Sequence, residues 1–166
     1  MKEVGVGIVG FGTVGAGVAE GLLKGMALIS RRCGVNVALR GIADLDITTD
    51  RGVAVPQDLL STDALALAVR EDIDIVVELI GGTGIAYTVV KTALENGKSV
   101  VTANKKLLAE KGAELFALAR EKHVDLYFGA SVGGGIPIIR SLRDGLVGND
   151  INAAYGILNG TCNYIL

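Results

Sequence analysis

The chain has 166 residues, half of them hydrophobic and 20% of them charged, and its formal net charge is −2. This length suits about one domain with a sizeable core, and the weakly acidic balance lacks the basic surface of a nucleic-acid-binding protein. No apolar run reaches the roughly 18 residues that cross a bilayer, and we expect no signal peptide. With only two cysteines, Cys33 and Cys162, we expect a soluble, cytoplasmic protein without a disulfide framework.

The first half of the chain alternates short apolar runs with helical patterns. Residues 4–10 predict a buried strand, and a helix follows over about 13–31. Residues 35–43 predict a second strand, and residues 61–72 predict a short helix. The nearly all-apolar run 73–80 is typical of a central strand in a parallel sheet, which is covered on both faces.

The alternation continues to about residue 148. We predict a helix over 85–96, a strand over 99–103, an amphipathic helix over 112–123, a strand over 124–130 and a helix over 136–148. Strands that alternate with helices favour right-handed crossovers and an α/β fold whose parallel sheet is doubly wound.

Residues 151–166 start a new element without closing it, and they end on the apolar pair Ile165 and Leu166. A docked terminal strand is one explanation. The run Asn-Gly-Thr-Cys-Asn between apolar segments favours the other, a cut inside a longer polypeptide. We therefore predict one domain over 1–150 and the start of a truncated second domain over 151–166.

A glycine motif directly follows the first predicted strand and opens the first predicted helix. Its residues are Gly10, Phe11, Gly12, Thr13, Val14 and Gly15. In this G-x-G-x-x-G pattern the glycines make a tight turn, admit a pyrophosphate and allow close helix–strand packing. The strand–turn–helix context predicts a Rossmann-type, dinucleotide-binding domain; the alternative is a glycine-rich turn without a ligand.

An acidic residue that binds the cofactor's ribose should lie at the end of the second strand. Asp44 is the first candidate and lies 29 residues after Gly15, which a long first helix would explain. A carboxylate there accepts from both ribose hydroxyls and repels a 2′-phosphate, so it favours NAD over NADP. The alternative is a solvated loop acid, and Arg40 and Arg51 are the nearest cations that would argue for NADP.

The loops after the later strands should lie on the same edge of the sheet, because ligands bind beyond the carboxyl ends of the strands. In the run ELIGG, we expect Ile80, Gly81 and Gly82 near the nicotinamide half of the cofactor. Glu78 either is a buried partner of another group or simply marks the end of the strand, and the residues alone leave both interpretations open. The runs TANKK and GASVGGGIP end the next two strands on this edge.

Two cations stand where a helix disfavours them. If Asn104 caps a helix, Lys105 and Lys106 fall in its first turn, at the positive end of the helix dipole. A solvated helix would carry Asp or Glu there. Because local rules are usually broken at functional sites, this pair marks a candidate site.

In these motifs and their order, the chain resembles the amino-terminal part of homoserine dehydrogenase. The resemblance runs the whole length, through VGIVGFGTVG, VVELIGG, GKSVVTANKKLLA, ASVGGGIPI and GILNGTCNYIL. It implies an oxidoreductase that interconverts L-aspartate 4-semialdehyde and L-homoserine with NAD or NADP, on the route to threonine, isoleucine and methionine. It also implies a small-molecule substrate, a homodimer or higher oligomer through a missing domain, and substrate residues that lie beyond this chain.

The resemblance also assigns residue roles. Lys105 occupies the family's catalytic position, facing the nicotinamide and the substrate, whereas Lys106 is expected in solvent. A sodium ion is implied at the positions matching Gly129, Val132, Gly134 and Ile136. The family commonly has Glu where this chain has Gly129, so the ion would depend on backbone carbonyl ligands.

Two other interpretations stay open beside this enzyme. A non-catalytic dinucleotide-sensing module would use Lys105 only as a phosphate or ribose contact. A fusion with aspartate kinase is the other, although Met1 directly before the first strand argues against an upstream kinase. As a cofactor-binding fragment, the chain is expected to bind NAD or NADP but to be inactive alone.

Overall fold

A computed structural model describes residues 2–156 of the chain. Its centre is a six-stranded sheet in which every neighbouring pair is parallel and the strand order is β3-β2-β1-β4-β5-β6. The strands are β1 (Glu3–Val9), β2 (Asn36–Ala43), β3 (Leu60–Ser61), β4 (Ile75–Glu78), β5 (Ser99–Thr102) and β6 (Leu126–Tyr127). This order is that of a Rossmann fold, so the predicted doubly wound parallel sheet is confirmed.

Five α-helices accompany the strands. They are α1 (Thr13–Cys33), α2 (Ala64–Val69), α3 (Ile85–Glu95), α4 (Lys105–Glu121) and α5 (Ile138–Arg140). Single turns of 3₁₀ helix occupy Gln57–Leu59 and Gly129–Ser131, and a wide π-type turn occupies Ser141–Gly145. Among the described residues, no helix is both long and apolar enough to cross a membrane.

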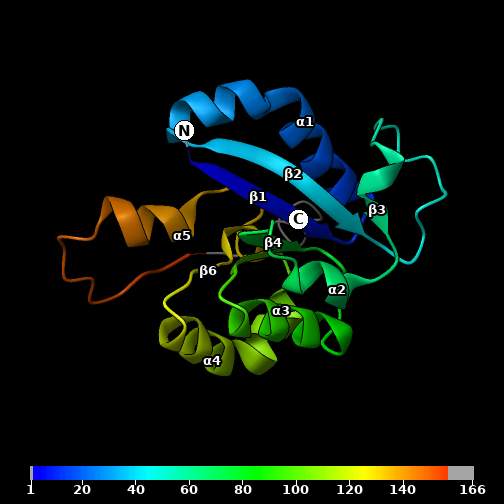
Figure 1. Ribbon diagram of the computed structural model, residues 1–166. Helices are drawn as coiled ribbons and strands as arrows, with labels where there is room; N and C mark the ends of the chain where they lie inside the picture. Colours follow the sequence, from blue (N-terminus) through cyan, green and yellow to red (C-terminus); the bar gives the residue numbers. More distant parts are fainter. Residues whose placement is uncertain (1, 157–166) are drawn as a thin grey trace, which may run out of the picture.

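Helices cover both faces of the sheet. Figure 1 shows α1 on one face and α2, α3 and α4 on the other. The two faces have separate apolar clusters. One joins Ala19 of α1 to Ile8 and Ile42, and the other joins the inner sides of α2, α3 and α4 to residues such as Val76 and Val100. This burial of one stripe on each helix holds the layers together, because burying apolar surface is the dominant favourable term in folding.

Several predicted boundaries were wrong for local reasons. The short helix α2 starts only at Ala64, because the Asp63 carboxylate caps it by accepting from the Ala66 amide at 2.9 Å. The amphipathic helix predicted over 112–123 is the second half of a longer helix that begins at Lys105, where the expected Asn104 cap places its start. The edge strand β3 was not predicted, since two residues are too few to show a pattern.

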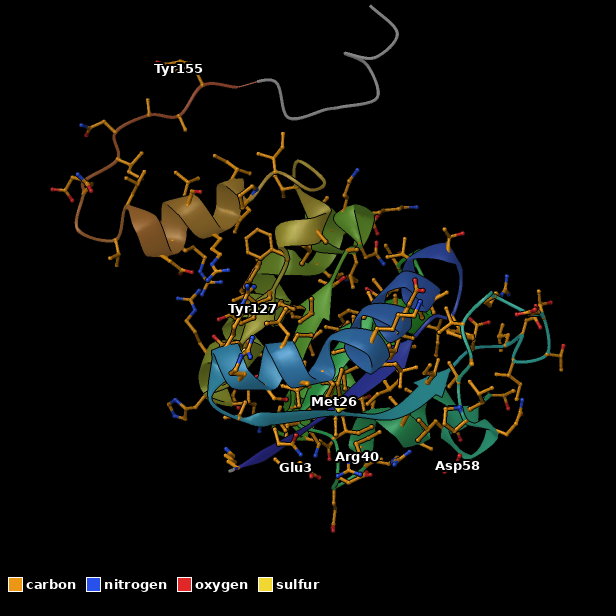
Figure 2. The ribbon with its side chains drawn as sticks, turned by 90° about the horizontal axis from the view of Figure 1, so that it is seen from above. Glu3, Met26, Arg40, Asp58, Tyr127 and Tyr155 are labelled. Carbon is orange, nitrogen blue, oxygen red and sulfur yellow. The ribbon has the colours of Figure 1, made fainter. Side chains whose placement is uncertain are left out.

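The end of the described chain departs most from expectation. The strand predicted over 124–130 is reduced to Leu126–Tyr127, and the helix predicted over 136–148 to α5 and the wide turn. Most residues from 140 onward are exposed, so little packing stabilises a longer helix there. Residues 151–156 form no helix or strand, and Tyr155 extends away from the body in Figure 2. The remainder of the predicted second domain, 157–166, lies outside the described residues.

Candidate functional site

A cleft of about 760 Å³ opens at the carboxyl ends of β1, β2 and β4. The strand order reverses between β1 and β4, which is the point where ligands bind in doubly wound sheets. Four of the predicted cofactor residues line this cleft, namely Gly10, Gly12, Asp44 and Ile80. The apolar side chains of Leu45, Leu65 and Ile85 also line it. The cleft therefore combines apolar walls with a few polar groups, as small-molecule sites do.

The three glycines of the motif have different surroundings. Gly10 has a φ of 104°, and a Cβ atom there would lie 2.8 Å from the carbonyl carbon of Leu79. At Gly15, a Cβ atom would meet the Gly10 carbonyl oxygen at 1.9 Å. At Gly12, a Cβ atom would meet nothing within 4 Å. Gly10 and Gly15 are thus required by the packing of the chain itself, whereas Gly12 leaves open space that a ligand can fill.

The first turn of α1 is suited to an anion. Gly12 is the N-cap and offers no side chain to the free amides, and the first turn holds no acidic residue. The helix is 21 residues long, so its dipole is fully developed at this end. Unpaired amide groups and a positive dipole make such a helix start a phosphate site. Of the other motif residues, Thr13 and Val14 are exposed in this turn, and Phe11 is buried in the α1-side cluster.

Asp44 ties the end of β2 to the glycine loop. One of its carboxylate oxygens accepts from the Phe11 amide, and the other accepts from the Asp46 amide at 2.8 Å. The Gly10 amide donates to the Ala43 carbonyl at 2.8 Å, beside this contact. The structure therefore places Asp44 at the cleft with its side chain half-buried, and not free in a solvated loop. Its binding of ribose stays a prediction.

The two candidate cations for a 2′-phosphate differ in position. Arg40 pairs with Glu3, the first residue of β1, and Figure 2 shows the two side chains together. Glu3 is at the end of β1 opposite the cleft, so Arg40 is directed away from it. Arg51 pairs with Asp46 at 3.0 Å in the loop after β2. Hydrogen bonds from Thr49 and Thr48 hold the pKa of Asp46 well below its usual range, so this partner of Arg51 stays charged.

A buried polar network joins the next two loops. Glu78 is fully buried at the end of β4, and its Oε2 accepts from the Thr102 hydroxyl at 2.6 Å. Its Oε1 accepts from the amides of Ile80 and Gly81 at 3.0 and 3.2 Å. Asn104 donates from Nδ2 to the Gly82 carbonyl at 2.6 Å. Of the two interpretations of Glu78, the structure thus favours the first, in which its carboxyl group is a buried partner of other groups. Through this network the loop 79–82 is also bound to the start of α4.

Lys105 and Lys106 occupy the first turn of α4, as predicted. Asn104 is the N-cap, and its Oδ1 accepts from the Leu107 amide at 3.0 Å. Both lysines are exposed, and Lys106 approaches Glu110 at 3.9 Å. Lys105 does not line the cleft but stands one strand further along the same edge, after β5. Its catalytic role stays a prediction.

The glycine-rich loop after β6 contains the four residues that were predicted to bind sodium. Of its four predicted ligands, the Gly129 carbonyl accepts from the Val132 amide at 3.3 Å and the Ile136 carbonyl accepts from the Ile138 amide at 2.8 Å. Within residues 2–156, no three acidic, His or Cys side chains gather as metal ligands. Two of the four predicted carbonyl ligands therefore already accept one hydrogen bond each, and the sodium ion stays a prediction.

Sequence reasoning missed two hydroxyl groups of this region. Thr102 accepts from the Asn104 amide at 3.0 Å while donating to Glu78, and Ser131 donates to the Thr102 carbonyl at 2.9 Å. Both are buried. A single Thr or Ser forms no recognisable sequence motif. The buried acid Glu78 on the neighbouring strand is the one signal that could have indicated Thr102.

Known proteins match the chain over its full length. Residues 10–129 match the family described as "Homoserine dehydrogenase, NAD binding domain", and residues 137–166 match that described as "Homoserine dehydrogenase". A homoserine dehydrogenase of Neisseria gonorrhoeae is 49% identical over 100% of this chain and 38% of its own length.

Solved structures agree with these matches. A homoserine dehydrogenase from Thiobacillus denitrificans has a TM-score of 0.90 and 44% identity, over 99% of this chain and 38% of that chain. A hyperthermophilic archaeal homoserine dehydrogenase in complex with NADPH has a TM-score of 0.71 and 29% identity, over 88% of this chain and 50% of that chain. The chain thus spans about 38% of the length of the Neisseria and Thiobacillus proteins.

The surroundings of Gly15 and Gly12 predict that alanine affects stability at the first position and cofactor binding at the second. Gly15→Ala should lower the free energy of unfolding by about 2 kcal/mol or more, because its methyl group overlaps backbone. Gly12→Ala should change stability by about 1 kcal/mol or less, yet weaken NADH binding at least about tenfold by filling the open space. Urea unfolding and calorimetric titration of the chain measure the two effects. Equal affinity of Gly12→Ala and the unsubstituted chain for NADH would contradict the assignment.

Proposed function

The chain belongs to the homoserine dehydrogenase family, and we propose that it supplies the cofactor site and one catalytic lysine of an enzyme that interconverts L-aspartate 4-semialdehyde and L-homoserine. The observation that carries the proposal is the cleft at the strand-order reversal, which has an uncapped helix start on one side and the Lys105 loop on the same edge. In the complete protein, this activity would serve threonine, methionine and isoleucine biosynthesis.

The residues of the cleft fit a dinucleotide. The free amides at the start of α1 would bind the pyrophosphate, and the open space at Gly12 would admit it. Asp44 would accept from the ribose hydroxyls, which favours NAD, while Arg51, in the loop after β2, is the cation that would contact the 2′-phosphate of NADP. Ile80 would lie against the nicotinamide half, with Gly81 and Gly82 completing that loop. When bound, the nicotinamide exchanges a hydride with the carbon that carries the substrate oxygen.

Lys105 would manage the proton that accompanies this exchange. In the reducing direction, its ammonium group would donate a proton to the aldehyde oxygen as that oxygen becomes the hydroxyl of homoserine. The hydrogen bonds of Asn104 to the Leu107 amide and to the Gly82 carbonyl fix the start of α4. They therefore also fix the backbone position of Lys105, the first residue of that helix. Lys106 lies beside it but interacts with Glu110 on the solvent side of the helix.

We extend the proposal to the domain organisation. Residues 1–150 would form the dinucleotide-binding domain, and 151–166 would begin a domain that binds substrate and joins subunits into a dimer or larger oligomer. The separate family matches over 10–129 and 137–166 support two units, although the second match begins at Pro137, before the proposed boundary at 150.

A non-catalytic dinucleotide sensor is the second candidate. It is favoured by one observation, that Lys105 is exposed and does not line the cleft. Both candidates require cofactor binding, and only the enzyme requires Lys105 for turnover.

Asp44 is expected to control the choice of cofactor. Asp44→Asn retains an acceptor for the Phe11 amide but loses the negative charge, so it should weaken NADH roughly 10–100-fold and NADPH less. Fluorescence titration of the chain with both cofactors measures this. Asp58→Ala, at an exposed acid of the 3₁₀ turn before β3, is the control and should bind both normally. Equal losses for the two cofactors would show that Asp44 is not the ribose acid.

Lys105 is expected to separate the enzyme from the sensor. In the complete protein that contains this chain, Lys105→Ala should leave NADH affinity nearly intact and reduce turnover about 10²–10⁴-fold, the usual loss for a proton-transfer group. Lys106→Ala is the control and should change little, since adjacent helix residues point about 100° apart. Steady-state oxidation of homoserine measures both. A Lys105→Ala protein with normal turnover would refute the catalytic role.

A further inference from the structure

Glu78 is an acidic residue in a buried position of the central sheet. It ends the central strand β4, has no exposed surface, and neighbours apolar residues along that strand. No ion pair within residues 2–156 involves it. Burying a carboxyl group without a cation is costly unless hydrogen bonds compensate it. Packing alone therefore does not explain the carboxyl group.

The carboxyl group connects two loops that the sheet itself does not connect. On one side, Oε1 holds the amides of Ile80 and Gly81, so both N–H groups point inward. The outer side of this loop is therefore formed by Ile80, which lines the cleft. On the other side, Oε2 accepts from the Thr102 hydroxyl, and Thr102 is the last residue of β5.

Thr102 passes the connection to the helix that carries Lys105. Its hydroxyl oxygen accepts from the Asn104 amide at 3.0 Å, and Asn104 in turn caps α4 through the Leu107 amide. The Asn104 side chain also donates to the Gly82 carbonyl. The two loops are therefore closed into a ring of hydrogen bonds, of which Glu78, Thr102 and Asn104 are the side-chain members.

From this ring we infer that Glu78 is a positioning residue of the reaction, which fixes Lys105 relative to the cofactor loop through Thr102. The inference rests on the proposed function, because it assigns no role to Glu78 unless Lys105 and the cofactor act together. A carboxyl group serves here because it has two oxygens that accept from both loops at once. An amide at this position would keep the two backbone donors on its oxygen, but its nitrogen would leave the Thr102 hydroxyl proton without an acceptor.

The Thr102 half of the ring can be broken while the half that holds the cofactor loop is kept. Thr102→Val keeps the shape of the side chain and leaves Glu78 holding Ile80 and Gly81, so the cofactor loop is retained while the bond from the Asn104 amide to Thr102 is lost. The direct bond from Asn104 to the Gly82 carbonyl remains. Thr102→Ser restores the hydroxyl group. Thr92→Val is the matched control, since Thr92 is half-buried near the far end of α3 and its hydroxyl group makes no described hydrogen bond.

The test uses the complete protein that contains this chain and measures NADH affinity and homoserine oxidation for each variant. Thr102→Val should lower kcat about 10–100-fold with little change in NADH affinity, as expected when a reacting group is displaced by about 1 Å. Thr102→Ser should recover most of the loss, and Thr92→Val should match the unsubstituted protein. In a Lys105→Ala background, Thr102→Val should cause no further loss of kcat, because both changes remove the same contribution.

Other outcomes overturn the inference in distinguishable ways. If the unsubstituted protein does not oxidise homoserine, the proposed function fails. If it does, and Thr102→Val has normal kcat or lowers it equally in the presence and absence of Lys105, the ring has no positioning role. Should Thr102→Val fail to fold, Glu78→Gln takes its place, with the same expected loss of kcat, retained NADH affinity and dependence on Lys105.

Discussion

Glu78 ends β4 with a carboxyl group that has no access to water, so its two oxygens must find hydrogen-bond donors inside the protein. The donors that it finds belong to the loop 79–82 and to Thr102 on the neighbouring strand. The carbonyl of Thr102 also accepts from Ser131, which adds the loop after β6. Three loops beyond the ends of the strands are thus arranged around two buried residues.

The opposite wall of the site is fixed by backbone contacts. Gly10 turns against Leu79, and Gly15 packs its backbone onto the Gly10 carbonyl, so α1 starts directly over the end of β1. Asp44 then joins this turn to the end of β2. Of the three glycines of the motif, Gly12 alone has free space beside it. The start of α1, which favours an anion, lies at the cleft between these walls, because Gly12 lines it.

Local patterns in the sequence were enough to predict the sheet class, the glycine motif and the Asn104 cap, because each depends on neighbouring residues. Asp44 lies 33 residues from Phe11, and its position beside the motif was predicted only because the carboxyl ends of neighbouring parallel strands meet at one edge of the sheet. The partner of Glu78 was not predictable, since Thr102 lies 24 residues away and meets it only through the register of β4 and β5. The two-residue strand β3 and the short helix α5 are too brief to have a period. The distance of Lys105 from the cleft depends on strand order, which the alternation of elements does not specify.

A crystal structure of this chain with NADH would test the central claim, that the cleft at the strand-order reversal is a dinucleotide site arranged by the Glu78 ring. The pyrophosphate should lie within hydrogen-bonding distance of the amides at the start of α1, the adenosine ribose on Asp44, and the nicotinamide beside Ile80. The bonds from Glu78 to Thr102 and to the Ile80 and Gly81 amides should be retained. NADH bound elsewhere on the chain, or bound in the cleft only after these bonds break, would contradict the account.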